Sequence, residues 1–337
     1  MNRTYTLVGA AFLATAFALS VGAGETPQAK AFKADAIASV PSGTLWRDRG
    51  NIGSLNLFDG PGGKEHRPGK TFTFVKEDPA GTSPKFDILD EHGVTWKAKL
   101  GEETKAETAA TRLLWAAGYF VDEDYYLAEI RVEKMPRLRR GQQFVSGDGV
   151  LHGVRLERKV KGQKKTGNWS WYKNSQVGTK DLSGLRIMMA LMNNWDLKEV
   201  NNAVYEHEGK EPRFVVSDLG ATFGRTGNPF VRSKSNMRDY RGTRFIQKIG
   251  PEHVDFYLSS RPFFLTVFDL PNYLTRTRMQ GVVKHIPRTH AQWLGHQLGQ
   301  LSGEQIRDCF RAAGYSSDEV EGFAKVVLGR ISDLNKL

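Results

Sequence analysis

The sequence is poor in cysteine. Cys309 is the one cysteine among 337 residues, so the chain can form neither an intramolecular disulfide nor a cysteine-based zinc cluster. The surrounding residues, IRDCFRAAG, have helix-forming character with one apolar side, which predicts a buried structural thiol. The number of cysteines does not indicate in which cellular compartment the protein is found.

Acidic residues are also in short supply. Lys and Arg total 48 against 37 Asp and Glu, giving a net charge of +11 and an isoelectric point near 9.6. This balance favours anionic partners such as a nucleotide, a phosphorylated substrate, nucleic acid or an anionic surface, although a solvated basic face would produce it equally. Hydrophobic and charged contents of 39% and 25% are ordinary for a globular protein long enough for one large domain or two lobes.

Long apolar runs are missing except at the N-terminus. Residues 1–23 combine Arg3, an uncharged apolar stretch over 7–21, and the small-x-small sequence Val21-Gly22-Ala23. This pattern predicts a signal peptide cleaved after Ala23, hence an exported protein, periplasmic or secreted. No cysteine lies nearby for a lipoprotein anchor. An uncleaved anchor is the alternative, although the run is short for a membrane span, and no further span is expected.

Residues 24–70 read as a linker and N-terminal extension, with small, polar and Pro-containing sequence over 24–44. The GPGGK run at 60–64 has no following GK[ST] and no strand-to-helix context for a phosphate-binding loop. It is therefore predicted to be a turn that folds back on the domain.

Strand patterns begin after residue 70. Residues 72–75, 86–89 and 94–100 alternate or are apolar, with a turn at 90–93. Period-2 spacing places Trp96, Ala98 and Leu100 on one face and Lys97 and Lys99 on the other. A strong helix former over 103–118 carries Glu107, and strands are predicted at 124–135 and 150–160. These elements would form a five-stranded lobe in which either lysine could face the glutamate.

The stretch 192–224 holds the most informative cluster. Asp196, Lys198 and Asn201 occur in the order Asp-x-Lys-x-x-Asn, and Asp218 ends an apolar run before Leu219-Gly220. Phosphoryl transfer needs a metal to neutralise phosphates and an acceptor that orients the attacking hydroxyl. Asn201 and Asp218 offer the oxygen ligands that Mg²⁺ prefers, Asp196 is a candidate base, and Lys198 would lie beside the transferring phosphoryl group. Helix capping is the alternative role for each aspartate.

The segments before and after 192–224 carry weaker patterns, which predict their structure and possible ligands. Residues 181–194 predict a buried helix leading to Asp196, and 254–337 is mostly helical with Ser-led caps. The lysines, Trp169, Trp171 and Tyr172 of 159–173 suit single-stranded nucleic acid, a sugar or phosphate substrate, or a link between lobes. Nucleic acid is the least favoured of these, given the export signal. Residues 223–244 suit an activation-type or substrate loop.

Together these motifs resemble the protein-kinase-like superfamily, in its atypical branches: HipA-like, phosphatidylinositol-kinase-like and secreted casein-kinase-like enzymes. Gly81-Thr82-Ser83-Pro84-Lys85-Phe86 is similar to the GxQPK loop of HipA-like proteins, which implies that Gly81 and Lys85 lie over the phosphates. Asn194-Trp195 replaces the usual His-Arg before Asp196. Neither GxGxxG nor Ala-Pro-Glu occurs, which puts recognition of a protein substrate in doubt more than nucleotide binding.

The resemblance implies an α+β, bilobal kinase-like fold, with an antiparallel sheet and one αC-type helix over 71–175 and a mainly helical lobe over 176–337. It implies that Lys99, with Lys97 as the alternative, pairs with Glu107 and binds ATP, while Asn201 and Asp218 hold Mg²⁺. One function hypothesis is an exported phosphotransferase acting on a hydroxyl of a protein, glycan or small molecule. The others are an inactive pseudokinase scaffold and an AMP-transferring relative. The oligomeric state stays open.

Overall fold

The computed structural model of the chain describes residues 42–228, 231–258 and 270–337. The predicted signal peptide and residues 24–41 of the predicted linker lie outside the described residues. In the described part, residues 41–337 belong to one compact unit. No helix among the described residues is both long enough and apolar enough to cross a membrane.

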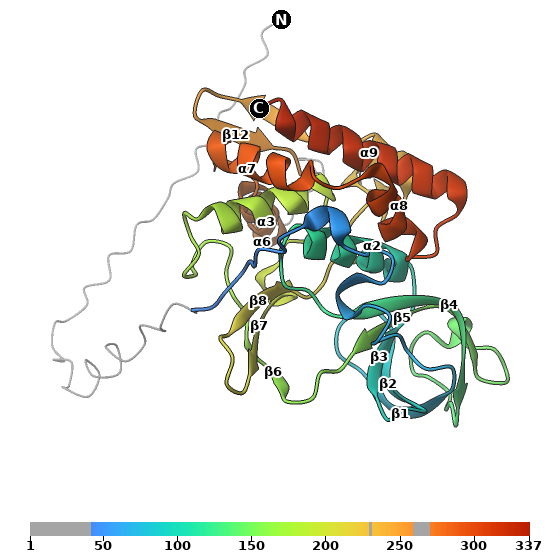
Figure 1. Cartoon of the computed structure of the whole chain (residues 1–337). Helices are drawn as coiled ribbons and strands as arrows, with labels where there is room; N and C mark the ends of the chain where they lie inside the picture. Colours follow the sequence, from blue (N-terminus) through green and yellow to red (C-terminus); the bar gives the residue numbers. More distant parts are fainter. Residues whose placement is uncertain (1–41, 229–230, 259–269) are drawn as a thin grey trace, which may run out of the picture. The chain divides into compact units, whose positions relative to one another are not determined.

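Strands β1 to β5 form the first layer of structure (Figure 1). They cover Phe72–Asp78, Lys85–Asp90, Thr95–Lys99, Asp124–Glu133 and Val150–Arg158. The order β1-β2-β3-β5-β4 is antiparallel except where β1 meets β4 in a short parallel pairing that closes the sheet into a barrel. The predicted alternation is present, because Trp96, Ala98 and Leu100 are buried in the barrel core. The barrel closure was not predicted.

Helix α2 (Glu103–Ala116) lies between the barrel and the helical part of the chain (Figure 1). Its small residues Ala106, Ala109 and Ala110 allow close packing and belong to the core of the helical lobe. Gly118, at φ +100°, ends the helix where a Cβ would lie 2.1 Å from the Trp46 indole nitrogen. Trp46 in turn donates a hydrogen bond to the Ala117 carbonyl. The extension before residue 70 therefore helps to fix α2.

The segment 42–70 contains two short 3-10 turns, Ile52–Ser54 and Gly60–Gly62. Leu45, Ile52 and Leu57 are buried in the helical core, and the Tyr125 hydroxyl donates to the Gly63 carbonyl at 2.8 Å. The GPGGK run is thus a turn that folds back on the domain, as predicted.

A second, three-stranded sheet carries the motif residues. Strands β6 (Gln163–Gly167), β7 (Asn202–His207) and β8 (Arg213–Val216) pair antiparallel in that order. Helix α3 (Lys180–Leu191) lies between β6 and β7 in the chain, with Thr179 accepting a capping bond from the Leu182 amide. The helix ends at the loop 192–201, whose last turn is the 3-10 segment Glu199–Asn201. The predicted buried helix leading to Asp196 is confirmed.

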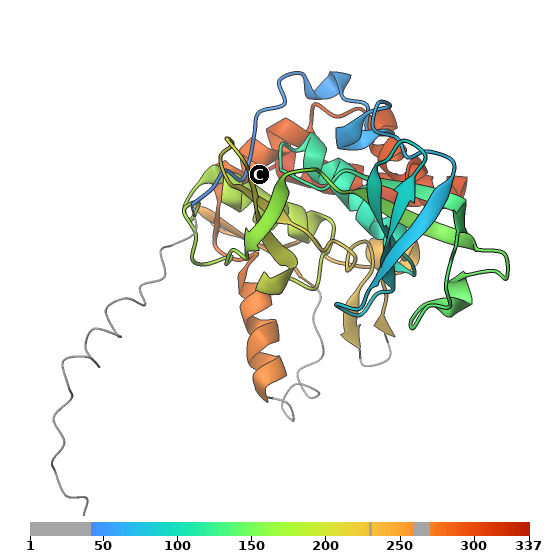
Figure 2. The same cartoon turned by 90° about the horizontal axis from the view of Figure 1, so that it is seen from below.

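The rest of the chain is mainly helical. A short 3-10 segment, η3 (Gln142–Phe144), lies between β4 and β5. The elements after β8 are β9 Thr226–Asn228, β10 Val231–Arg232, α4 Met237–Arg241, β11 Ile246–Ile249, β12 His253–Phe256, α6 Leu270–Gly281, β13 Ile286–Pro287, α7 Arg288–Leu298, α8 Gly303–Arg311 and α9 Ser317–Asn335. Ser302 and Ser316 form capping boxes at the starts of α8 and α9. Cys309 is buried on α8, as its surroundings predict. Figure 2 shows α6 extending from the helices. The described residues therefore form the predicted α+β arrangement of a strand-rich lobe and a mainly helical lobe.

Candidate active site

The Lys99 side chain lies at the centre of a group of carboxylates. Its ammonium is 2.5 Å from Glu107 Oε1 and 2.5 Å from Glu103 Oε2, and 3.9 Å from Asp218 Oδ1. Lys99 comes from the cleft-facing side of β3, the two glutamates come from successive turns of α2, and Asp218 follows β8. Three separate segments of sequence thus converge on one ammonium group.

Burial and charge act against each other in this group. Burial alone would lower the pKa of Lys99, but Glu107, Asp218 and Glu103 outweigh it and raise that pKa, so the ammonium stays charged. Burial likewise opposes ionisation of Glu103, yet Lys99 and Lys234 lower its pKa to about 2. For the fully buried Glu107, burial dominates over Lys99 and Arg155 and raises the pKa to about 7. Glu103 therefore loses its proton more readily than Glu107 does.

Asp218 is held in place by the turn that follows it. Its Oδ1 accepts a hydrogen bond from the Gly220 amide at 3.1 Å, while its side chain remains 45% exposed toward the cleft. A Cβ at Gly220 would lie 2.7 Å from the Glu103 carboxyl carbon. Glycine is required there because α2 approaches the backbone so closely.

Asn201 is joined to the Asp218 segment by backbone contacts. The Ser217 amide and hydroxyl both donate to the Asn201 carbonyl, at 2.8 and 3.0 Å. The Asn201 side-chain amide donates to the Asp196 carbonyl at 2.9 Å. These bonds fix the end of the Asp-x-Lys-x-x-Asn loop against the end of β8.

Asp196 pairs with its own loop. Its carboxylate is 2.9 Å from the Lys198 ammonium, and its amide is capped by the Asn194 side chain at 3.2 Å. The preceding residue, Trp195, donates its amide to the Ala221 carbonyl at 3.3 Å. The loop that carries Asp196 therefore runs beside the segment after Asp218.

A cavity of about 360 Å³ lies between the barrel and the second sheet. Its lining residues are Gly81, Thr82, Ser83, Lys85, Lys97, Lys99, Glu107, Asp122, Arg155, Glu157, Lys165, Val200, Asn201, Tyr205, Ser217 and Asp218. The structure thus brings together in one cavity the predicted residues Gly81, Lys85, Lys99, Glu107, Asn201 and Asp218. Both candidate lysines line it, but only Lys99 contacts Glu107.

Asp196 and Lys198 are not part of that lining. Lys198 instead borders a neighbouring pocket of about 320 Å³ with mainly apolar walls, including Trp171, Leu197 and Met279. Val200 lines both the cavity and this pocket. Of the two predicted catalytic residues, Lys198 therefore borders the second, more apolar pocket, whereas Asp196 lines neither opening.

The loop 81–85 covers one side of the cavity. Ser83 donates a hydrogen bond to Glu103 at 2.8 Å, Lys85 lies 3.7 Å from Asp78, and Arg140 donates to the Gly81 carbonyl. Gly81 has φ +71°, a left-handed conformation that suits glycine. The loop is consequently tied both to the first turn of α2 and to the strand before it.

The carboxylates fit a divalent cation in chemical type. Oxygen atoms of Glu103, Glu107 and Asp218 lie within 4.8 Å of one another, and hard oxygen donors are what Mg²⁺ prefers. Among these, Asp218 lines the cavity with the greatest exposure, and Asn201 lines it on the same side. Asp218 and Asn201 could therefore hold a cation facing bound phosphates, while Lys99 occupies the space between the two glutamates.

One acidic and one basic residue of this group, Glu103 and Arg155, were not predicted from the sequence. Glu103 contacts Lys99 as closely as Glu107 does, and the Glu-x-x-x-Glu spacing on one helix face could have signalled it. Arg155 lies 3.1 Å from Glu107 Oε2 and 2.8 Å from Asp124, and its position opposite Lys99 on β5 could not be read without the strand register.

The tryptophans of 159–173 are part of the folded core. Trp169 and Trp171 are 1% and 3% exposed, so neither ring is available for stacking on a nucleic acid base or a sugar. Their indole nitrogens donate to the carbonyls of Val215 and Leu197, both at 3.1 Å. This part of the basic stretch therefore supports β8 and the Asp196 loop.

Neither a protein-family model nor a curated protein sequence matches the chain. Among solved structures, it is similar to the Helicobacter pylori proinflammatory kinase CtkA, with 10% identity and a TM-score of 0.47 over 80% of this chain and 97% of that one. It is also similar to the Golgi casein kinase, both with Mn/ADP bound (10% identity, TM-score 0.40) and in a second structure (12%, 0.36), over 80% of this chain and 73% of that protein. The likeness concerns the fold alone.

Proposed function

We propose that the chain is an exported phosphotransferase that moves the γ-phosphate of ATP to a hydroxyl group of a protein, glycan or small molecule. The observation that carries this proposal is the Lys99 ammonium, 2.5 Å from Glu107 and 3.9 Å from Asp218 inside a cavity of about 360 Å³. A buried ammonium held by carboxylates at a cavity wall is a fixed positive charge. Such preorganised charge stabilises phosphate groups in a site that excludes much of the water.

Different residues of the chain would bind the phosphates and the cation. Lys99 is held by Glu107 so that its ammonium faces the cavity, where it would bind the phosphates nearest β3. Gly81 and Lys85 would cover them from the loop. Asp218 and Asn201 would hold a divalent cation at the opposite wall. A bound Mg²⁺ would supply neutralisation of the phosphate charge.

The acceptor hydroxyl would meet Asp196. This carboxylate lies 2.9 Å from the Lys198 ammonium, and Lys198 borders the neighbouring apolar pocket. Asp196 would accept a hydrogen bond from the hydroxyl and orient its oxygen toward the γ-phosphate, and Lys198 would stabilise the charge that develops there. The apolar pocket would then take the part of the acceptor next to the hydroxyl.

The direct test is stabilisation by nucleotide. Mg²⁺-ATP should raise the melting temperature of the wild type, with a smaller effect in Asp218→Ala, because ligand that binds only the folded state stabilises it. Glu133→Gln, an exposed carboxylate at the far end of β4, is the matched control. A wild type with no gain from Mg²⁺-ATP would contradict the proposal.

Mass spectrometry after incubation with ATP separates the proposal from its alternatives. Transfer to the protein itself or to a test acceptor adds one phosphate in the kinase reaction and one AMP in the nucleotidyl-transfer reaction. A protein that binds Mg²⁺-ATP but transfers neither group under any acceptor condition would be a pseudokinase.

Export is part of the proposal and rests on residues 1–23. Their charged start, apolar run and Val21-Gly22-Ala23 sequence fit signal-peptidase cleavage. The intact mass of protein recovered from the exported fraction should correspond to a chain starting at Gly24. Full-length protein confined to the cytoplasm would contradict export while leaving the phosphotransfer proposal standing.

A further inference from the structure

The strand register sorts the charges of the cleft-facing barrel surface into two rows. Lys85 pairs with Lys99, which pairs with Arg155, so one row across β2, β3 and β5 is cationic. Two residues further along each strand, Lys97 pairs with Glu157. Since strands rise about 3.3 Å per residue, the second row lies roughly 7 Å from the first.

The cationic row lies at the phosphate end of the cavity. Lys99 contacts Glu103 and Glu107 of α2 and lies near Asp218, and Lys85 belongs to the covering loop. The second row must then face the part of the ligand that is furthest from the transferred phosphate. For a nucleoside triphosphate bound in this direction, that part is the base.

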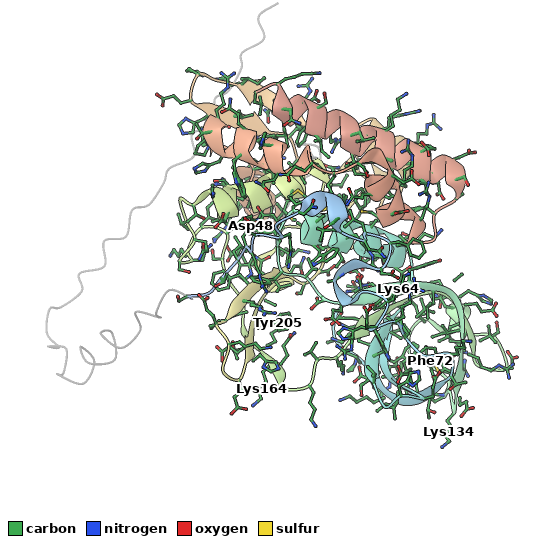
Figure 3. All side chains as sticks on the ribbon, in the orientation of Figure 1. Asp48, Lys64, Phe72, Lys134, Lys164 and Tyr205 are labelled. Carbon is green, nitrogen blue, oxygen red and sulfur yellow. The ribbon has the colours of Figure 1, made fainter. Side chains whose placement is uncertain are left out.

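The second row is joined by residues from elsewhere in the chain. Asp122, which precedes β4, lines the same cavity as Glu157, Lys97 and Tyr205, and the Glu157 carboxylate contributes to raising the pKa of Asp122. Lys165, the register partner of Tyr205 on β6, also lines this cavity. Figure 3 shows Tyr205 on the second sheet, with Phe72 within the barrel. The base end of the cavity is thus enclosed by charged groups from both sheets.

This lining is unusual for a nucleotide base. Small-molecule pockets are mostly lined by apolar and aromatic side chains with a few polar groups. Here the cavity-lining residues include one aliphatic side chain, Val200, and one aromatic side chain, Tyr205. Recognition of a base at this end must therefore depend on hydrogen bonds and charge more than on an apolar sandwich.

We propose that Asp122 and Glu157 read the Watson–Crick edge of a purine base, and that the protein accordingly binds GTP at least as tightly as ATP. This inference rests on the proposed function, because it assumes that a nucleoside triphosphate occupies the cavity with its phosphates on Lys99.

The hydrogen-bonding patterns of the two purines support this preference. Guanine presents the O6 acceptor beside two adjacent donors, N1–H and N2–H₂, and one carboxylate can accept from both donors at once. Adenine presents one donor, N6–H₂, beside the N1 acceptor. With Glu157 as the carboxylate and Asp122 beside it, guanine can make one more hydrogen bond than adenine.

The state of Asp122 fits the remaining guanine acceptor. Burial and the neighbouring Glu157 carboxylate raise the pKa of Asp122 well above its ordinary value, with Arg155 acting in the opposite direction. A protonated Asp122 can donate to O6 while Glu157 accepts from N1–H and N2–H₂. Lys97, cross-strand from Glu157, is a second donor for the same oxygen.

The first test uses wild-type protein alone. Dissociation constants are measured by calorimetry for the Mg²⁺ complexes of GTP, ITP, ATP and inorganic tripolyphosphate. GTP should bind at least as tightly as ATP, and ITP, which lacks only the N2 amino group, should bind about tenfold more weakly than GTP because a hydrogen bond to a charged group is lost. ATP binding more than tenfold tighter than GTP would overturn the proposal.

The second test removes the carboxylate. Glu157→Gln should weaken GTP about tenfold, change ATP less, and leave tripolyphosphate unchanged. Glu133→Gln should alter none of them. If the ratio of the dissociation constants for GTP and ATP were unchanged in a folded Glu157→Gln protein, the proposal that Glu157 binds the base would be overturned.

The controls separate this inference from the proposed function. Tripolyphosphate binding with no added affinity from any base would overturn the inference and leave the phosphate site in place. Absence of binding by every nucleotide and by tripolyphosphate would overturn both. Equal binding of GTP and ITP would also count against the inference, because the N2 amino group would then have no partner.

Discussion

The indole nitrogen of Trp171 donates a hydrogen bond to the carbonyl oxygen of Leu197 at 3.1 Å. Leu197 directly follows Asp196, so this buried ring, 26 residues before Leu197 in the chain, supports the backbone of the proposed catalytic loop. The ring also forms a wall of the apolar pocket beside Lys198. A side chain that sequence composition associates with substrate binding is thereby a positioning residue.

Trp171→Phe should lower kcat about tenfold, because a loop held slightly out of place loses much of the benefit of orientation. The unpaired carbonyl and lost contacts should lower the free energy of unfolding by about 1–3 kcal/mol. Nucleotide affinity should stay within about twofold, since the ring does not line the nucleotide cavity. Trp115→Phe, a partly buried tryptophan on α2, serves as the control in phosphate-transfer and melting assays. Equal loss of kcat in both variants would refute the positioning role.

Asp196→Asn should separate chemistry from binding. An amide keeps the size of the side chain but cannot accept the hydroxyl proton, so turnover should fall about 10²–10⁴-fold. Since Asp196 does not line the nucleotide cavity, Mg²⁺-ATP affinity should remain nearly unchanged. The two quantities are measured by phosphate transfer to the acceptor and by calorimetry. Parallel loss of both would contradict the role proposed for Asp196.

Lys99→Met and Lys97→Met should have different effects although both lysines face the cavity. Lys99→Met leaves Glu107 buried without its nearest cation, so the free energy of unfolding should fall by about 3–5 kcal/mol. It should also abolish measurable tripolyphosphate binding, tested by calorimetry at a temperature where the variant is folded. Lys97→Met should keep tripolyphosphate binding, because its row faces the other end of the cavity. The opposite pattern would reassign the phosphate-binding lysine to position 97.

The part of this site that could be predicted from sequence is local. Alternation with period two placed Lys97 and Lys99 on the face opposite Trp96, and a strong helix former placed Glu107 after them. The order of the elements follows from such local patterns, whereas the fold class was implied by the resemblance of the motifs to a known family. Which lysine meets Glu107 depends on the packing of α2 against the helical lobe, which no local pattern contains.

The remaining features depend on contacts between distant segments. The parallel pairing of Phe72 with Val132 closes the barrel, and only the three-dimensional register reveals the cationic and carboxylate rows. The burial of Trp169 and Trp171 likewise depends on distant contacts, because Trp169 stacks on Phe214 of β8 and Trp171 packs edge-on against Trp169. Composition alone would place both residues on a surface. The functional roles of Asp196, Asn201 and Asp218 stay predictions that the experiments above address.

Glu103 should give stability a measurable acid dependence. Its folded pKa of about 2 lies below its ordinary value of 4.5, so its contribution is present above pH 4.5 and is lost as the pH falls toward 2. The two-and-a-half-unit difference corresponds to at most about 3 kcal/mol. Glu103→Gln should therefore lower the free energy of unfolding at pH 7 and flatten its fall between pH 4.5 and 2. Glu102→Gln, its exposed neighbour, should leave the denaturant-derived pH profile unchanged, and an identical profile for Glu103→Gln and wild type would refute the assignment.

Asp124 connects the stability of the fold to the site. The fully buried carboxylate accepts from Arg112 and lies 2.8 Å from Arg155, and Arg155 in turn lies 3.1 Å from Glu107. Asp124→Asn leaves two buried guanidinium groups short of a counter-charge, so the free energy of unfolding should fall by about 3–5 kcal/mol. The exposed pair of Arg131 and Asp148 provides the comparison.

In that comparison, Asp148→Asn should change the free energy of unfolding by less than about 1 kcal/mol, because exposed ion pairs contribute little. Asp124→Asn should additionally weaken Mg²⁺-ATP binding at temperatures where it is folded, since Arg155 loses one of the three carboxylates, of Glu107, Asp124 and Glu157, that hold it beside Lys99. Urea unfolding and calorimetry measure the two effects. A destabilised Asp124→Asn protein with wild-type nucleotide affinity would show that the buried network supports the barrel and α2 without setting the charge that the cavity presents to phosphates.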